Sequence, residues 1–248
     1  MPTITPIPAL TDNYIWLIQH NNQAICIDPS EAAPVLDYLH AHGLTLAQIW
    51  ITHAHTDHTS GIAALTQRFS GCPVYGAEDI PQATRIVRDG DRIAWQNHRA
   101  TVWHTAGHTA RHRCYLLNQQ HLFTGDTLFS AGCGRVFPNS RPQWLYHSLQ
   151  RIFRLPDATQ LYPAHEYTAA NLHFAAHIEP NNPHIAAAQQ RADSIPTLPV
   201  TLAHEKQINP FLRVHLSAVQ QRIRELTGRS YANEEAYFVA LRELKNRF

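Results

Sequence analysis

The stretch THAHTDH, residues 52–58, places three histidines and one aspartate within six consecutive positions. It follows a short β-branched and aromatic run at residues 49–52, and it precedes Gly61 and an apolar run with helical spacing. We therefore expect a loop between a strand and a helix, which can direct all four side chains to one point. Neutral imidazoles suit zinc, iron and nickel, and the carboxylate adds negative charge, so the stretch indicates a transition-metal site.

The density of histidine in this stretch decides its interpretation. The chain has eighteen histidines in 248 residues, so a lone histidine is expected to be an ordinary surface or core residue. Three within six positions, beside an aspartate, are not explained in that way. The metalloprotease spacings H-E-x-x-H and H-x-x-E-H do not occur in the sequence. The remaining metal ligands must therefore come from other parts of the chain.

Length and composition set the class of protein. A chain of 248 residues with 44% hydrophobic residues can bury a substantial core, and its net charge of +1 disfavours a nucleic-acid or membrane surface. From residue 205 onward, eight Lys and Arg against five Asp and Glu make the end mildly basic. The sequence shows no signal peptide, no apolar run of about 18 residues and no C-x-x-C pair. We expect a cytoplasmic monomer with reduced cysteines.

The pattern of apolar residues divides the chain into two parts. Strands are predicted at 4–7, 14–18, 24–27, 49–52, 73–75, 100–104, 114–117, 121–124 and 160–162. Helices are predicted between residue 30 and Gly43, at 60–69 and at 142–153, and then at 169–177, 183–192, 214–226 and 234–246. We therefore predict a mixed α/β domain at residues 1–165, which contains the candidate metal site, and a helical domain at residues 166–248.

Three further candidate ligands share one local context. His108, Asp126 and His165 each lie just beyond a strand-like run and directly after a small residue, which allows a sharp turn. Taken singly, Asp126 is also explained as a turn residue and His108 as a surface histidine. If the strands end on the same side of a layered structure, the set converges on the first loop. Asp126 then has two oxygens with which to bridge a pair of metals.

The order of these motifs resembles the metallo-β-lactamase superfamily. The pattern T-H-x-H-x-D-H, then G-H-T, then G-D-T and a last histidine spans residues 52 to 165. The resemblance implies an α+β fold, a four-layer αββα sandwich with a dinuclear metal site at one sheet edge. It implies that Asp57 and Asp126 orient a metal-bound hydroxide. The ligands implied are His53, His55 and His108 for the first metal, Asp57, His58 and His165 for the second, and Asp126 as the bridge.

Other segments are similar to one family within that superfamily. TDNYIW at 11–16, AGCGR at 131–135, HEYT at 165–168, NPFLR at 209–213 and LRELK at 241–245 resemble glyoxalase II, the hydroxyacylglutathione hydrolases. The resemblance covers essentially the whole chain. It implies hydrolysis of the thioester of S-(2-hydroxyacyl)glutathione, such as S-lactoylglutathione, to glutathione and lactate in methylglyoxal detoxification. It also implies two divalent metal ions, for which we expect zinc, with iron or manganese also suited to these ligands.

The resemblance also implies which residues bind glutathione. Arg135 and Tyr167 would contact it from the first domain, and Arg242 and Lys245 from the last helix. Arg242 and Lys245 stand at i and i+3 on one helix face, and glutathione is anionic. The alternative for this pair is a solvated helix end stabilised by the helix dipole. Phe137 replaces a tyrosine found in many members, so one hydroxyl donor to glutathione would be missing.

Two other functions remain open at this point. A glutathione persulfide dioxygenase with a single iron would share much of the first-domain pattern, although we expect it to lack the long helical domain. A metal-storing or metal-sensing protein would explain the histidines but not a cationic helix near the site.

A serine hydrolase is disfavoured because the chain has no G-x-S-x-G motif. For a thioester no general acid is required, because a thiol with a pKa of about 8.5 leaves readily.

Overall fold

The first half of the chain builds a six-stranded sheet from short runs of β-branched and aromatic residues. The computed structural model describes residues 2–248. The strand order in this sheet follows the sequence; β1 to β3 pair antiparallel, and β3 to β6 pair parallel. Its strands are β1 (Thr3–Ala9), β2 (Asn13–His20), β3 (Gln23–Ile27), β4 (Thr45–Trp50), β5 (Val74–Gly76) and β6 (Arg85–Ile86).

The second sheet also has six strands, in the order β14-β13-β10-β9-β8-β7. Only β10 and β13 pair parallel; the other neighbours are antiparallel. A separate pair, β11 (Leu128–Phe129) and β12 (Gly132–Cys133), follows β10. The strands of the sheet are β7 (Arg92–Trp95), β8 (His98–His104), β9 (Arg113–Leu117), β10 (His121–Gly125), β13 (Gln160–Pro163) and β14 (Val200–Thr201).

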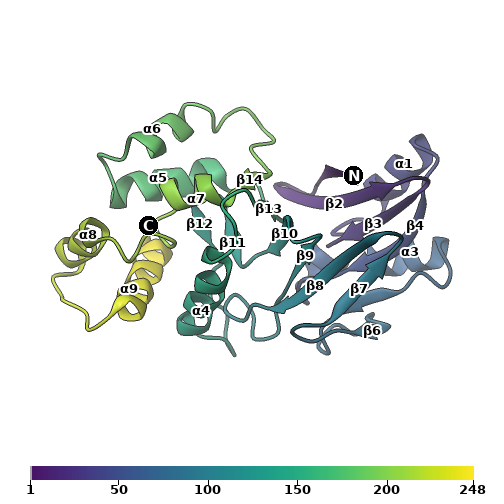
Figure 1. Ribbon diagram of the computed structural model, residues 1–248, viewed down its shortest axis with the longest axis horizontal. Coiled ribbons are helices and arrows are strands. Elements are labelled where there is room, and N and C mark those ends of the chain that lie inside the picture. The colour runs from purple at the N-terminus through teal and green to yellow at the C-terminus, as the bar shows by residue number, and fades with distance from the viewer. Residues whose placement is uncertain (1) are drawn as a thin grey trace.

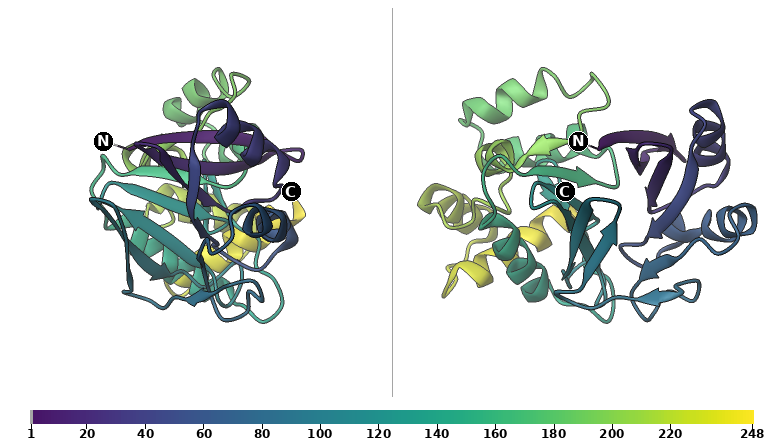
Figure 2. Two further views of the ribbon diagram at one scale, coloured as in Figure 1. Left: turned by 90° about the vertical axis from the view of Figure 1, so that its right-hand side faces the viewer. Right: turned by 45° about the vertical axis from the view of Figure 1, so that its right-hand side comes forward.

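Helices lie outside both sheets, and most of the later ones gather at one end of the molecule (Figure 1). The turned views in Figure 2 show the two sheets face to face and the C-terminal helices beside the second sheet. The early helices are α1 (Ala33–Ala41), α2 (Thr56–Thr59), α3 (Ile62–Arg68) and α4 (Pro142–Phe153). The later ones are α5 (Thr168–Ile178), α6 (Pro183–Gln189), α7 (Leu202–Ile208), α8 (Ser217–Thr227) and α9 (Glu234–Arg247).

Alternation along β2 sets the order of the layers. Tyr14, Trp16 and Ile18 point into the core between the sheets, where they meet aromatic and aliphatic side chains of the second sheet. Ile15 and Leu17 point the other way, into a core shared with α1 and α3. A third core fills the far face of the second sheet against α4, α5, α8 and α9. The predicted four-layer αββα sandwich is therefore confirmed.

The predicted elements are found, and several short ones were missed. Helix α4 has the predicted bounds. Asn233 caps α9, because its Oδ1 accepts from the backbone N–H of Ala236 at 2.9 Å. The helix before Gly43 begins at Ala33 rather than near Ser30. No helix among residues 2–248 has the length and apolar character needed to cross a lipid bilayer. The missed elements are β6, β7, β11, β12, β14, α2 and α7.

Candidate metal centre

All seven predicted ligands come together at one end of the sandwich. They lie in four loops: after β4, between β8 and β9, after β10 and after β13. The two sheets are joined here, because the N–H of Tyr14 donates to the carbonyl of Ala164 at 2.7 Å. Gly125 has a φ of +48°, and a Cβ there would lie 2.5 Å from Thr52 Oγ1. Glycine therefore allows β10 to turn toward the first loop before Asp126.

The first group of ligands consists of His53, His55 and His108. His55 Nδ1 lies 2.9 Å from His53 Nε2 and 3.2 Å from His108 Nε2. His53 and His108 are buried, and His55 is partly exposed. Three imidazole nitrogens thus face one point, as a transition metal with nitrogen ligands requires.

The second group consists of Asp57, His58 and His165. Asp57 Oδ2 lies 3.6 Å from His58 Nε2 and 3.5 Å from His165 Nε2. Asp57 and His58 belong to the single turn of α2, which follows the extended residue His55. That turn explains how one loop serves both groups.

Asp126 lies between the two groups. Its Oδ2 is 3.4 Å from His108 Nε2, in the first group. Its Oδ1 is 3.5 Å from both His58 Nε2 and His165 Nε2, in the second. The two oxygens of one carboxylate are therefore divided between the two groups, as the predicted bridge requires.

Unsatisfied polar atoms at this point fit a pair of cations. His58 Nε2 and Asp126 Oδ1 are buried and have no hydrogen-bond partner among residues 2–248. Buried polar groups in proteins are nearly always paired, so each exception needs a physical cause. A divalent cation between the imidazoles and the carboxylates would pair both atoms. The donor set, five imidazoles and two carboxylates, suits zinc, iron or manganese.

The second ring nitrogen of each of four predicted ligand histidines meets an oxygen atom. His165 Nδ1 lies 2.7 Å from Asp12 Oδ1, and His108 Nδ1 lies 2.8 Å from the carbonyl oxygen of Arg135. Such contacts fix the tautomer and orientation of a metal-bound imidazole. The other two contacts are His58 Nδ1 to Asp28 Oδ2 at 3.0 Å and His53 Nδ1 to Thr52 Oγ1 at 3.0 Å. The sequence did not identify Asp12, Asp28 or Thr52, because their roles depend on long-range contacts.

His112 is a further buried residue that the sequence analysis missed. Its Nε2 accepts from the backbone N–H of Asp126 at 3.2 Å, and its ring stacks on His53 at 4.9 Å. Its Nδ1 lies 3.1 Å from the hydroxyl oxygens of both Thr105 and Thr127. Its position four residues after His108 was the available signal. Its hydrogen bond holds the backbone of Asp126, the predicted bridging residue.

Burial and charge prepare these groups for a metal. Burial, followed by the neighbouring imidazoles, holds the pKa of His53 well below its usual range, so this ring is neutral. The hydrogen bond with His165 lowers the pKa of Asp57 despite partial burial. Burial opposes the charge of His58, but Asp126 and Asp28 outweigh it and raise the pKa to about 9. In the metal-free protein His58 thus carries a proton that a metal must displace.

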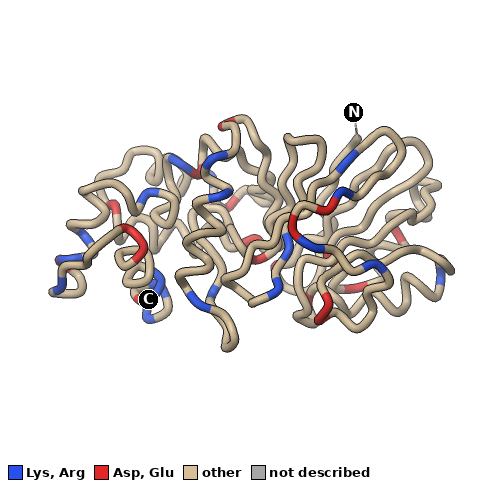
Figure 3. The backbone as a smooth tube through the Cα atoms, turned by 60° about the horizontal axis from the view of Figure 1, so that its bottom comes forward, with Lys and Arg blue, Asp and Glu red and all other residues tan. Residues whose placement is uncertain are grey.

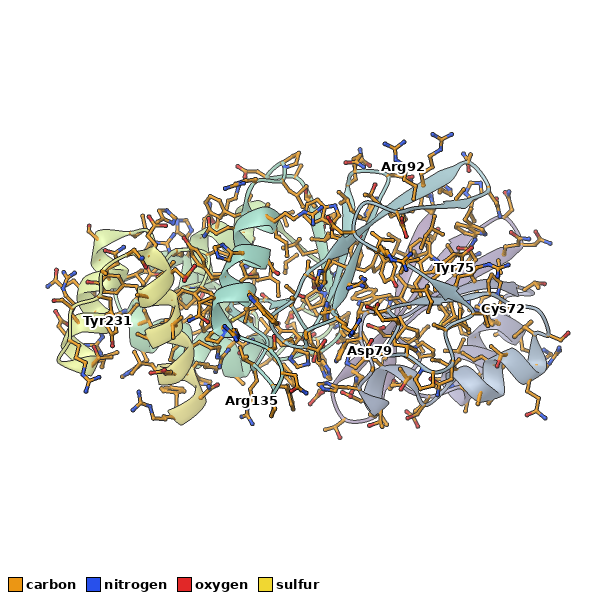
Figure 4. The ribbon with its side chains drawn as sticks, turned by 90° about the horizontal axis from the view of Figure 1, so that it is seen from below. Cys72, Tyr75, Asp79, Arg92, Arg135 and Tyr231 are labelled. Carbon is orange, nitrogen blue, oxygen red and sulfur yellow. The ribbon has the colours of Figure 1, made fainter. Side chains whose placement is uncertain are left out.

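The predicted substrate-binding residues fall into two groups. Phe137 and Tyr167 contact ligand histidines: Phe137 is 41% exposed with its ring 4.6 Å from that of His55, and Tyr167 stacks on His165 at 4.7 Å. The side chain of Arg135 is exposed near α4 (Figure 4).

Arg242 and Lys245 are placed differently, on α9. Arg242 is only 5% exposed, and its Nη1 donates to the carbonyl of Cys133 at 2.8 Å. The ammonium of Lys245 lies over the ring of Phe174 at 5.1 Å. The guanidinium of Arg242 is thus engaged with the protein backbone.

Comparison with known proteins agrees with this fold. The family model described as the Metallo-beta-lactamase superfamily matches residues 10–165, which contain every predicted ligand, and the architecture and site define a member of that superfamily. A second family model, the Hydroxyacylglutathione hydrolase C-terminus, matches residues 166–248. The chain belongs to the hydroxyacylglutathione hydrolase family.

Relatives over the full length support this assignment. A hydroxyacylglutathione hydrolase of Neisseria gonorrhoeae (strain NCCP11945) is 56% identical, with 99% of each chain covered. One of Aliivibrio salmonicida is 44% identical, with 100% of each covered. Among solved structures, ETHE1 from Myxococcus xanthus has a TM-score of 0.69 and 28% identity, covering 99% of this chain and 91% of its own. The BLEG-1 B3 metallo-beta-lactamase, with a TM-score of 0.65 and 21% identity, covers 86% of this chain and 99% of its own and shares the fold.

Proposed function

We propose that this protein hydrolyses the thioester of S-(2-hydroxyacyl)glutathione, such as S-lactoylglutathione, to glutathione and a 2-hydroxy acid such as lactate. The position of Asp126 carries the proposal, because its two carboxylate oxygens are divided between two groups of ligands. When bound there, two divalent cations lower the pKa of a water to about 7 and polarise a thioester carbonyl. We propose zinc for both, with iron and manganese as the alternatives.

The residues around the cations have separate tasks in this proposal. Asp57, with a side chain 38% exposed, and Asp126 accept hydrogen bonds from the attacking water and orient it. Phe137 and Tyr167 cover the ligand histidines and exclude other water. The thiolate of glutathione leaves without a proton donor, because its conjugate thiol has a pKa of about 8.5. The chain therefore needs no general acid.

Recognition of glutathione is assigned to both parts of the chain. The exposed guanidinium of Arg135 and the ammonium of Lys245 attract the two carboxylates, and Tyr167 lies beside the second ligand group. We assign the metals to residues 1–165, and glutathione binding to residues 166–248 together with Arg135.

Acidic and basic residues are interspersed along the molecule (Figure 3), which supports a small substrate rather than nucleic acid. A monomer in the cytoplasm is part of the proposal, and the four unpaired cysteines fit the reducing conditions of that compartment.

One experiment separates thioester hydrolysis from the alternative function, that of a glutathione persulfide dioxygenase. The protein is loaded with zinc or iron, mixed with S-lactoylglutathione, and the free thiol released is measured with a thiol reagent. The same preparations are then given glutathione persulfide while dissolved oxygen is recorded. Thiol release without oxygen uptake is the expected result. Oxygen uptake by the iron form without thioester cleavage would contradict the proposal and favour a persulfide dioxygenase.

A further inference from the structure

The backbone of residues 129–134 lies close to two of the proposed metal ligands, Asp126 and His108. The segment begins three residues after Asp126 and contains the turn between β11 and β12. It ends at Gly134, next to Arg135, whose carbonyl accepts from His108 Nδ1 at 2.8 Å. The position of this segment therefore bears on both Asp126 and His108.

Two asparagines from the C-terminal part donate to carbonyls of the segment. Asn171 of α5 donates from Nδ2 to the carbonyl of Ser130 at 3.0 Å. Asn209, just after α7, donates from Nδ2 to the carbonyls of Phe129 at 3.1 Å and Gly132 at 3.0 Å. Both side chains are buried, at 6% and 0% exposure.

Two charged residues complete the set. Glu205 of α7 accepts from the N–H of Ala131 and the hydroxyl of Ser130, each at 2.8 Å, and it is 0% exposed. Arg242 of α9 donates from Nη1 to the carbonyls of Cys133 at 2.8 Å and Gly134 at 3.4 Å. Together the four side chains bond every residue from 129 to 134. We call Asn171, Glu205, Asn209 and Arg242 the clamp.

The far end of the segment lies directly against the metal ligands. A Cβ added at Gly134 would come 2.0 Å from the carbonyl oxygen of Asp126 and 3.0 Å from His108 Nδ1. The backbone here is therefore packed against both residues without spare room. A displacement of the segment must move the carbonyl that orients His108, or the backbone of Asp126, or both.

We infer that the clamp residues are positioning residues for the metal centre: through the backbone of 129–134, the C-terminal helices set how tightly the metals bind. The C-terminal helices supply none of the seven proposed ligands. They nevertheless hold the backbone segment that packs against Asp126 and His108. Buried hydrogen bonds in a low-dielectric interior hold geometry strongly, and partners behind metal ligands are worth 10- to 100-fold in affinity. The inference rests on the proposed dinuclear centre and extends it.

The test is a zinc dissociation constant, measured by competition with a chromophoric chelator on the full chain. Glu205→Ala and Asn171→Ala are expected to weaken zinc binding about 10-fold. Glu205→Gln should stay within about 3-fold of wild type, because the amide still accepts from Ala131 and can donate to Ser130. Gln207→Ala and Glu243→Ala change exposed positions on α7 and α9 and serve as matched controls with unchanged affinity.

Circular dichroism of each metal-free variant separates positioning from simple loss of folding. All constants are taken at a temperature where the metal-free variant is fully folded. If Glu205→Ala does not fold, Arg242→Met replaces it, since the methionine stem keeps contact with Phe211, whose ring lies 5.1 Å from the guanidinium. Folded clamp variants that bind zinc as tightly as wild type overturn the inference. A wild type that binds neither zinc nor iron nor manganese overturns the proposed function instead.

Discussion

Asp126 is the residue on which both proposed metal positions depend. Its Oδ1 and Oδ2 face different ligand groups, so removing the carboxylate takes a ligand from each. We expect Asp126→Ala to lose at least one metal and to reduce kcat for S-lactoylglutathione by at least about 100-fold. Asp37→Ala, an exposed acid on α1, is the control and should retain wild-type kcat. Turnover by Asp126→Ala within a few-fold of wild type would refute the bridging role.

Phe137 gives a prediction about substrate affinity. Its ring packs edge-on against His55 and His108 and is 41% exposed, so a para hydroxyl would lie at the rim of the site. A neutral hydrogen bond contributes about 0.5–1.5 kcal/mol. Phe137→Tyr is therefore expected to lower KM for the thioester by about 2- to 10-fold with kcat unchanged. Steady-state kinetics measures this, and an unchanged KM would show that glutathione does not reach this position.

Helix α7 carries a buried acid that should make stability depend on pH. Burial raises the pKa of Glu205 to about 7, although Asn209, Ser130 and Ala131 donate to it. Because this folded pKa lies above the unfolded value near 4.5, the folded state binds the extra proton between these limits. Protonated Glu205 therefore contributes to the free energy of unfolding in full below pH 4.5, and this contribution is lost as the pH rises through 7.

The matched variant for this effect is Glu205→Gln, which cannot titrate. Between pH 4.5 and 7, the free energy of unfolding of wild type should fall relative to the variant by about 3 kcal/mol. Denaturant titration of both proteins across this range measures the difference, in which the histidines of the metal centre cancel. A difference that is constant with pH would place the Glu205 pKa near its unfolded value.

Elements with a clear hydrophobic periodicity, or with proline or capping residues at their ends, were predictable from the sequence. Helix α4 has Pro142 at its first turn and Pro156 beyond its end, and its bounds were predicted correctly. The strands β11, β12 and β14 have two residues each, which is too short for any alternation to register. Helix α7 follows the proline-rich stretch 196–199 and has only seven residues.

The candidate site was predictable only where its chemistry is concentrated in the sequence. The seven proposed ligands stand in recognisable motifs, whereas Asp12, Asp28 and His112 act through contacts that only the folded chain creates. Arg242 is a second case in which the sequence did not reveal the contacts of a side chain. Its spacing with Lys245 placed the two residues on one helix face, but did not show that the guanidinium is buried against the backbone of Cys133. Helical periodicity does not reveal which neighbour a side chain meets.

At the scale of the whole molecule, the metals would tie the two sheets together. The ligand loops come from both sheets, and α2 and β13 meet at the site. A metal present at 1,000 times its Kd stabilises the folded state by about 4 kcal/mol. For a chain of this size that corresponds to a Tm higher by about 8 °C or more. Removing the metals with a chelator should lower Tm by this amount and added zinc should restore it; an unchanged melting curve would deny the link between metal and fold.

The arrangement of seven side chains around two cations is tested most directly by anomalous diffraction from crystals of the zinc-loaded protein. The expected map has two peaks about 3.5–4 Å apart. One should lie within about 2.0–2.2 Å of His53, His55 and His108, the other within that range of Asp57, His58 and His165, and both beside Asp126. A single peak, or peaks bound to other side chains, would contradict the dinuclear centre.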